Sequence, residues 1–410
     1  MTMRPATRTG GARSALGPGG ATILILGITS FLTDVSSEMT LTVLPIFLTA
    51  TLGVSVATVG VIEGVGESTA AIARLFAGQL SDRLPRRLPV VIGGYGLSAL
   101  TKPLFALVGG AGLAGVLRFT DRLGKGVRTA PRDALIADAA AHGRRGLAFG
   151  VHRAADTAGA VLGVSAAALL LAVLGTEHGL TRGEFQRLVL IAAIPAILGV
   201  LLLTRIREEP HAPAPSAGGM RLFSLPDSPA ERRYLLVVLA FALGNSSDAF
   251  LVLRMADVGI GIVALLLVLA GRNLVEVLLS VPAGMLSDRM GRHRLLLAGY
   301  LVYALIYGGL AFAESRPAIV LLILGYGAYY GATEGMSRAF VADLSPSGQR
   351  GRSFGWFHMA TAVTALPASV IAGALWTEVG PEAAFSFGAG CALLAFVLLM
   401  TVRAPRTALS

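Results

Sequence analysis

The sequence predicts an all-α polytopic membrane protein with twelve transmembrane helices, arranged as two parallel six-helix repeats. Of the 410 residues, 54% are hydrophobic and only 14% are charged, and the mean hydropathy is +0.71, far outside the usage of soluble domains. Apolar or small-residue runs of membrane-spanning length, about 20 residues, recur along the chain. One short charged motif also occurs twice, each time between two apolar runs.

The repeated motif reads GQLSDRLPRR from Gly78 to Arg87 and GMLSDRMGRHR from Gly284 to Arg294. Each copy places one aspartate between two apolar runs and follows it directly with arginines. This is the pattern of a short hairpin at a membrane surface, and two copies predict two halves.

The predicted spans are placed by apolar composition and length. The first set lies near residues 21–49, 54–80, 90–109, 112–137, 147–174 and 187–204, and the second near 233–253, 258–285, 294–313, 317–341, 353–376 and 381–402. Pro, Gly, Ser and mixed charge between the sets indicate a linker. The predicted organisation is a disordered tail over 1–20, a bundle over 21–204, a linker over 205–232 and a second bundle over 233–403.

The fourth span, residues 112–137, carries too many charges for an ordinary hydropathy scan. An internal repeat identifies it: ADAAAHGRRGLAFG, ending at Gly150, aligns with ADLSPSGQRGRSFG, ending at Gly355. Because the segment before the second copy is plainly apolar, its counterpart should also span. The nearly constant offset makes the halves parallel repeats, related by an axis along the membrane normal.

The distribution of arginine predicts the orientation. Most lie on the side of the two hairpins, whereas the opposite side carries Arg182, Arg187, Arg254 and Arg316. The positive-inside rule then places both termini, the hairpins and the linker in the cytoplasm. The net charge of +10 follows from this topology, so nucleic-acid binding is not expected. The single Cys391 is expected to be a small buried apolar residue.

Acidic and basic side chains fall within the predicted spans in balanced numbers. Each costs about 2.5–3.5 kcal/mol at a lipid-facing helix centre, so they must face one another, water or a solute. They could be structural salt bridges, such as Arg272 with Glu276 and Glu334 with Arg338 at i, i+4. For the whole set a functional pathway is the better explanation, because apolar replacement of buried ion pairs is often neutral or stabilising.

The repeated motif resembles the G-x-L-S/A-D-R-x-G-R-R loop of the major facilitator superfamily, the large family of twelve-helix secondary transporters. The first copy departs from it with Pro85 in place of Gly. The resemblance covers residues 21–403 and implies a central cavity lined by helices 1, 4, 7 and 10. It implies a monomer with no catalytic centre, cofactor or metal site. The candidate transport residues, including a polar stripe on the second span, are Asp34, Glu38, Glu63, Glu67, Arg118, Arg122, Lys125, Arg128, Asn245, Asp248, Glu334 and Arg338.

The hairpins also have a candidate gating role. Asp82 and Asp288 stand at helix ends, where a carboxylate can cap the positive N-terminus of a helix from the same or the other half. In the family this contact is held to stabilise the outward-open state, with the arginines paired to acids such as Asp138 or Asp343. An anchor of topology alone is the interpretation favoured for Arg87. The candidate gating residues are Gly78, Asp82, Arg83, Arg86, Gly284, Asp288, Arg289 and Arg292; Arg294 is interpreted like Arg87.

We therefore expect a secondary active transporter that moves a small solute by alternating access in a bacterial-type inner membrane. We expect coupling to protons and export of a drug, metabolite or metal. Gly159 and Gly163 resemble the antiporter motif G-x-x-x-G-P, with Val164 in place of Pro. The alternatives are an importer or uniporter and a lipid flippase on the same fold. A membrane enzyme with His152 or His358 as base is disfavoured, because no Ser-His or His-Asp constellation recurs at a shared depth.

Overall fold

The computed structural model describes residues 16–141, 143–173, 180–210, 225–245, 248–260, 262–346 and 348–402, and every regular element in these ranges is a helix. The first group contains α2 (Gly20–Leu41), α3 (Leu44–Ile46), α4 (Val56–Arg83), α5 (Leu88–Leu104), α6 (Ala111–Ala139), α7 (Arg145–Val173) and α8 (Arg182–Leu203). The second contains α9 (Pro229–Gly244), α10 (Ala249–Asp257), α11 (Ile262–Met290), α12 (Arg292–Phe312), α13 (Arg316–Leu344), α14 (Arg350–Glu378) and α15 (Pro381–Met400). The predicted all-α class is confirmed.

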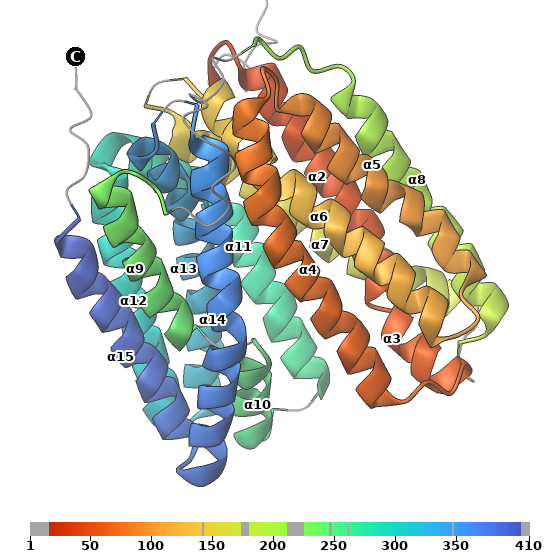
Figure 1. The fold of residues 1–410 in the computed structure, drawn as a ribbon. Helices are drawn as coiled ribbons and strands as arrows, with labels where there is room; N and C mark the ends of the chain where they lie inside the picture. The colour runs from red at the N-terminus through yellow and green to blue at the C-terminus, as the bar shows by residue number, and fades with distance from the viewer. Residues whose placement is uncertain are drawn as a thin grey trace, which may run out of the picture.

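The two groups of helices stand side by side (Figure 1). They meet at the upper end of the view, where α4 ends and α14 begins, and spread apart toward the lower end. Across the interface α4 packs against α14, and α7 packs against α11 and α13. The upper end contains the two helix connections that lie within the copies of the repeated motif, and we call it the hairpin end.

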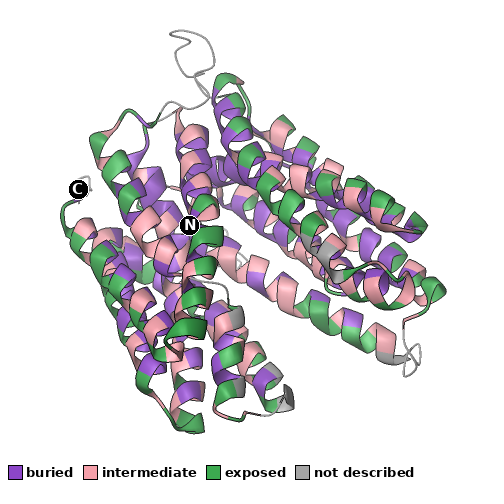
Figure 2. Ribbon diagram, turned by 60° about the horizontal axis from the view of Figure 1, so that its bottom comes forward, coloured by how far each residue is buried: buried purple, intermediate pink, exposed green. Residues whose placement is uncertain are grey.

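Burial is distributed as in a protein surrounded by lipid (Figure 2). Large apolar side chains lie on the outer faces, and Leu305 and Leu366 are 66% and 74% exposed. Charged side chains lie inside: Lys102 and Asp133 are completely buried. This is the reverse of a soluble protein, in which lysine and aspartate are almost never fully buried unless paired.

Eight candidate membrane spans are found among the described helices by length and apolar composition. The helices α4, α6 and α13 are not among them, yet they lie within the same bundle (Figure 1). The helix predicted from the internal repeat alone is present as α6, with its charged side chains turned into the protein. The predicted domain boundaries stay predictions, because residues 1–15 of the tail and 211–224 of the linker lie outside the described residues.

The seventh predicted span, 233–253, is not one continuous helix. The helix α9 ends at Gly244, Asn245 leaves the helical conformation with φ −89° and ψ 76°, and α10 begins at Ala249. The Asn245 side-chain oxygen accepts hydrogen bonds at 3.3 Å from the hydroxyls of Tyr303 and Tyr326. Glycine followed by asparagine is a common way to end a helix, and this break directs polar groups into the bundle.

The two hairpins differ in length because of one residue. In the second, Gly291 alone separates α11 from α12, and it adopts a φ of +92°. Proline cannot adopt a positive φ, so the first copy, with Pro85 at this place, needs a longer connection over residues 84–87. The register of the arginines therefore shifts by one position between the copies.

Candidate functional site

Two aspartates close the hairpin end by capping helices of the opposite group. Asp82 of α4 accepts hydrogen bonds of 2.9 and 2.7 Å from the first backbone amides of α14. Asp288 of α11 accepts two of 2.9 Å from the first amides of α7. A carboxylate at a helix N-terminus satisfies unpaired N–H groups and interacts favourably with the helix dipole. The two contacts are related by the internal repeat and both cross the interface.

Buried arginines join each of these aspartates to a second acid. Arg87 forms a salt bridge with Asp82 and another, with its Nε, to Asp138 at 3.0 Å; Asp138 is also paired with Arg350 of the opposite group. In the second copy Arg292 pairs with Asp288 at 2.7 Å and with Asp343, while Arg145 pairs with Asp343 at 2.7 Å. The predicted pairing of hairpin arginines with Asp138 and Asp343 is therefore present in the structure.

The interpretation of Arg87 as an anchor of topology alone is wrong. Its side chain is 1% exposed and forms a salt bridge with the motif aspartate, Asp82, as Arg292 does with Asp288 in the second copy. Arg86, which aligns with Arg292 in sequence, is exposed, as are Arg83 and Arg289. The longer first hairpin explains this shift, because the extra residues carry Arg87 rather than Arg86 to the aspartate.

We expect Arg87→Ala to lower the free energy of unfolding by about 1–3 kcal/mol, because Asp82 and Asp138 lose a buried charged partner. Arg86→Ala, the matched control, should stay within about 0.5 kcal/mol of the parent because Arg86 is exposed. Denaturant unfolding in detergent measures both changes. Equal effects of the two variants would contradict this assignment of the arginines.

Paired glycines allow the two groups to approach at the hairpin end. A Cβ atom on Gly78 would meet the carbonyl oxygen of Gly351, and one on Gly351 would meet that of Gly78. In the related contact, a Cβ on Gly146 would lie 2.6 Å from the carbonyl oxygen of Gly284. These glycines are helical, so close backbone approach rather than an unusual φ requires them. Gly78 and Gly284 are the first residues of the two motif copies.

We expect Gly78→Ala to force the hairpin end apart, because the added methyl group has no room beside Gly351. Spin labels on cysteines at Arg205, just after α8, and at Arg294 of α12, both exposed, would report a longer distance in a Cys391→Ser background. Gly96→Ala is the control, since a Cβ there meets no atom within 4 Å. An unchanged distance in the Gly78 variant would argue against steric closure by these glycines.

Charged side chains between α4, α5 and α6 form pairs. Arg118 forms a bidentate salt bridge with Glu63, in which the Nε of Arg118 donates to Oε1 of Glu63 at 2.9 Å. Arg122 lies 3.0 Å from Glu67, which is half exposed, and these four predicted residues are thus brought together. The pairs are on one side of the bundle, within the first helix group.

Asp34 of α2 has an acidic neighbour. The charges of Asp156 of α7 and of Lys125 and Arg128 of α6 act on its carboxylate. Arg128 lies over the ring of Tyr95 at 4.2 Å. This electrostatic influence agrees with the predicted approach of first-helix acids to fourth-helix cations, for which no direct ion pair of Asp34 is described. For the other acid, Glu38, the described contact is a hydrogen bond from Thr42 at 3.4 Å.

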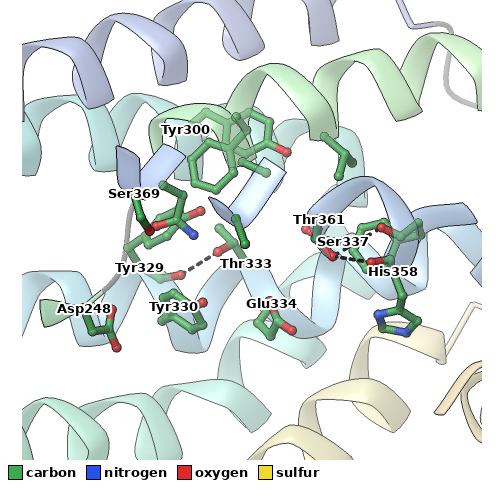
Figure 3. Close-up of a pocket in the computed structure, with 16 residues that line it drawn as sticks. Asp248, Tyr300, Tyr329, Tyr330, Thr333, Glu334, Ser337, His358, Thr361 and Ser369 are labelled. Carbon is green, nitrogen blue, oxygen red and sulfur yellow. Dashed lines mark hydrogen bonds between the residues drawn. The ribbon is translucent and has the colours of Figure 1, made fainter. Parts of the chain in front are cut away.

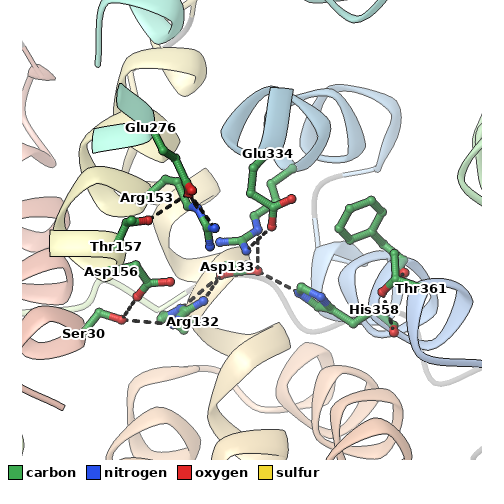
Figure 4. Close-up of polar contacts among 12 residues, drawn as sticks. Ser30, Arg132, Asp133, Arg153, Asp156, Thr157, Glu276, Glu334, His358 and Thr361 are labelled. Atoms are coloured by element: carbon green, nitrogen blue, oxygen red, sulfur yellow. Dashed lines mark hydrogen bonds and ion pairs between the residues drawn. The ribbon is translucent and has the colours of Figure 1, made fainter. Parts of the chain in front are cut away.

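A chain of polar contacts leads from Asp156 across the interface (Figure 4). Ser30 donates to Asp156, and Arg132 donates to the Ser30 hydroxyl at 3.3 Å. Arg132 also binds Asp133 at 2.9 Å, and His358 of α14 contacts the other Asp133 oxygen at 2.9 Å. Arg338 of α13 lies 3.9 Å from the same oxygen, so the completely buried Asp133 of α6 is held by two side chains of the second group.

A second buried acid joins the groups near this chain. Glu276 of α11 is bound by Arg153 and Thr157 of α7, at 2.7 and 2.9 Å. The predicted pair of Arg272 with Glu276 is therefore wrong, and Arg272 instead binds Asp248 at 2.6 Å. Residues four apart on one helix compete with partners on other helices, and here the other helices supply the closer acid.

The second group contains a cavity of about 460 Å³ (Figure 3). The predicted residues Asn245, Asp248 and Glu334 line it, together with His358 from the polar chain. Glu334 pairs with Arg338 at 2.7 Å, as the i, i+4 spacing predicts. The aromatic lining includes Phe241, Tyr300, Tyr329, Tyr330 and Phe357.

Sequence reasoning did not select several of these residues as site residues. Asp133 and Asp156 are charges inside predicted spans, which was an available signal, but their partners come from distant parts of the chain. The tyrosines of α12 and α13 recur at helical spacing, and such a stripe is ordinarily core.

Comparison with known proteins agrees with this architecture. The model of the Major Facilitator Superfamily matches residues 26–270 and 233–410. An uncharacterised MFS-type transporter of Methanocaldococcus jannaschii is 34% identical over 387 residues, covering 93% of this chain and 94% of that protein. An uncharacterised protein of Mycobacterium tuberculosis is 29% identical over 394 residues, covering 94% of each.

Solved transporters share the fold. The fucose–proton symporter of Escherichia coli superposes with a TM-score of 0.79 at 16% identity, over 94% of this chain and 99% of that one. A human organic anion transporter gives a TM-score of 0.75 at 17% identity, over 93% and 99%. At such identities the likeness concerns the fold alone.

A helical bundle with apolar outer faces, buried interior charges and a paired closure at one end is the architecture of a membrane transporter. The chain belongs to the major facilitator superfamily. It is accordingly a membrane-embedded transporter and not an enzyme, which removes the hypothesis of a membrane enzyme with a histidine base.

Proposed function

We propose that this protein is a proton-coupled secondary transporter that exports a small solute by alternating access. The observation that carries the proposal is the polar chain from Asp34 and Asp156 to the cavity. Asp34 and Asp156 are neighbouring carboxylates, and like charges disfavour the doubly ionised pair, which favours a proton on one of them. We therefore take this pair as the proton site at one end of the chain and the cavity as the solute site at the other.

The chain also runs through the interface that must open. Asp133 lies between the two groups and is bound by His358, which lines the cavity. Ser30 links Asp156 to Arg132 by two hydrogen bonds, and Arg132 in turn binds Asp133. A change of charge at the Asp34–Asp156 pair can therefore affect Asp133 through Ser30 and Arg132. This connection supports coupling between protonation, solute binding and closure of the hairpin end.

The orientation of the proposed cycle follows from the arginines. With the hairpins in the cytoplasm of a bacterial-type cell, the closed hairpin end is the cytoplasmic side and the structure is the outward-facing state. The bundles over 21–204 and 233–403 then rock as two bodies around the cavity, joined by the linker 205–232. We propose that a single chain is the transporting unit.

Export is the proposed direction because Gly159 and Gly163, which resemble the antiporter motif, pack directly on the backbone of α2 beside Asp34. Val164 in place of proline and the fold of a proton symporter favour uptake as the second candidate. The two directions predict opposite movements of protons for the same movement of solute.

Purified protein in proteoliposomes with a pH-sensitive dye tests the proposal. Vesicles loaded with members of a panel of cations, organic anions, metals or amphipathic drugs are diluted into solute-free buffer. Antiport should acidify the lumen as solute leaves, whereas symport should make it more alkaline. No pH change with any member, from protein that is folded, would contradict proton coupling; lipid translocation in the same vesicles would then identify a flippase.

A further inference from the structure

The cavity presents carboxylates to its interior and keeps their arginine partners behind them. Asp248 is 51% exposed in its side chain, but its partner Arg272 is 10% exposed; Glu334 is 28% exposed and Arg338 is 8%. Among the described residues that line the cavity there are two carboxylates and a histidine, and no lysine or arginine. A solute in the cavity therefore meets negative rather than positive groups.

Each carboxylate can accept further hydrogen bonds. Arg338 binds Oε1 of Glu334, and the described contacts give Oε2 no partner. Arg272 binds Oδ2 of Asp248, and Oδ1 accepts a long hydrogen bond of 3.4 Å from Tyr326. An ionised carboxylate has about four acceptor sites on its two oxygens, so both acids can accept further donors or a positive charge.

Aromatic rings surround these acids. Phe241 stacks on Tyr300 with ring centroids 4.8 Å apart and lies 6.0 Å from Tyr329. Phe357 lies on the histidine side of the same cavity. Aromatic faces carry negative potential and attract cations, and they also pack well against apolar groups. Figure 3 shows Tyr329, Tyr330 and Glu334 among the residues that line the cavity.

We propose that the cavity binds an amphipathic organic cation, with its positive charge between Asp248 and Glu334 and its apolar body against the rings of Phe241, Tyr300 and Tyr329. The inference rests on the proposed function, because it takes this cavity as the solute site. The volume of about 460 Å³ is within the range of pockets for drug-sized molecules.

Equilibrium binding in detergent with two ions of matched shape tests the sign of the charge. Tetraphenylphosphonium and tetraphenylborate carry the same four phenyl rings and opposite charges. The folded protein should bind the cation at least about tenfold more tightly than the anion, because both compete for a cavity lined by carboxylates. Tighter or equal binding of tetraphenylborate would overturn the inference.

Glu334→Gln and Asp248→Asn locate the site. Each should weaken tetraphenylphosphonium binding by about fivefold or more and strengthen tetraphenylborate binding, since the arginine behind the removed charge is left unneutralised. Glu382→Gln, an exposed carboxylate in the first turn of α15, is the matched control and should bind both ions as the parent does. A general loss of folding would lower both affinities, so the opposite changes are diagnostic.

Binding and transport are measured separately. Proton-coupled flux of some other solute class, with no selective binding of the phosphonium ion, would overturn the cation site and leave the proposed function intact. Selective binding that responds to Glu334→Gln supports the site even if the pH-gradient experiment fails. Cation selectivity that persists unchanged in both carboxylate variants would place the ion elsewhere and contradict the inference.

Discussion

Asp34→Asn is expected to abolish solute movement driven by a pH gradient while exchange of solute across the membrane continues. The asparagine side chain has nearly the shape of aspartate but can neither gain nor lose a proton. The amide group of asparagine can donate a hydrogen bond to the neighbouring Asp156 carboxylate, so the bundle should stay folded. The defect should therefore concern coupling and not assembly.

Two assays in the same proteoliposomes separate these effects. Counterflow of labelled solute against excess unlabelled solute reports exchange without net proton movement, and dye response reports net coupled flux. Glu314→Gln, an exposed carboxylate between α12 and α13, serves as the control and should behave as the parent. Parent-like coupled flux in the Asp34 variant would exclude this residue as the proton site.

Removal of the Asp133 carboxylate should have the largest effect on stability. Asp133 is completely buried and contacts Arg132, Arg338 and His358. Asp133→Ala removes the carboxylate that forms an ion pair with the buried Arg132 and leaves Arg338 with Glu334 alone. Removal of one partner of a buried ion pair typically lowers the free energy of unfolding by roughly 3–5 kcal/mol. Because two of the partners belong to the opposite helix group, the variant should also favour an open hairpin end.

Intrinsic fluorescence can follow this unfolding, because the chain has just two tryptophans, Trp356 and Trp376, and both lie on α14. The double variant Asp133→Ala/Arg338→Met should lose less stability than the two single losses added together, since both changes remove the same contact between Asp133 and Arg338. Additive losses would mean that the two side chains act independently and that the 3.9 Å contact contributes little.

Periodicity and repetition predicted the architecture well. The helix α6 illustrates this, because its charges conceal it from hydropathy and only the second half of the chain identifies it. The break after Gly244 escaped prediction, since hydropathy is continuous from 233 to 253 although glycine and asparagine together allow a helix end.

Individual contacts were less predictable. The i, i+4 spacing predicted the pair of Glu334 with Arg338 on one helix. It could not predict that Arg272 pairs with Asp248 instead of Glu276, because that depends on how the helices pack. It likewise selected Arg86 by alignment, whereas one proline in the hairpin brings Arg87 to Asp82. Sequence shows which residues are charged, and three-dimensional packing decides which partner each one takes.

The twofold closure of the hairpin end has an energetic consequence. Asp82 of the first helix group caps the start of α14, and Asp288 of the second helix group caps the start of α7. The two groups are therefore joined by two contacts, one contributed by an aspartate of each group. If the hairpin end opens during transport, as we propose, both contacts must be broken before the two bodies can separate there. The free energies of the two contacts then add in the barrier to opening, and weakening one contact should lower the barrier by the share of that contact alone.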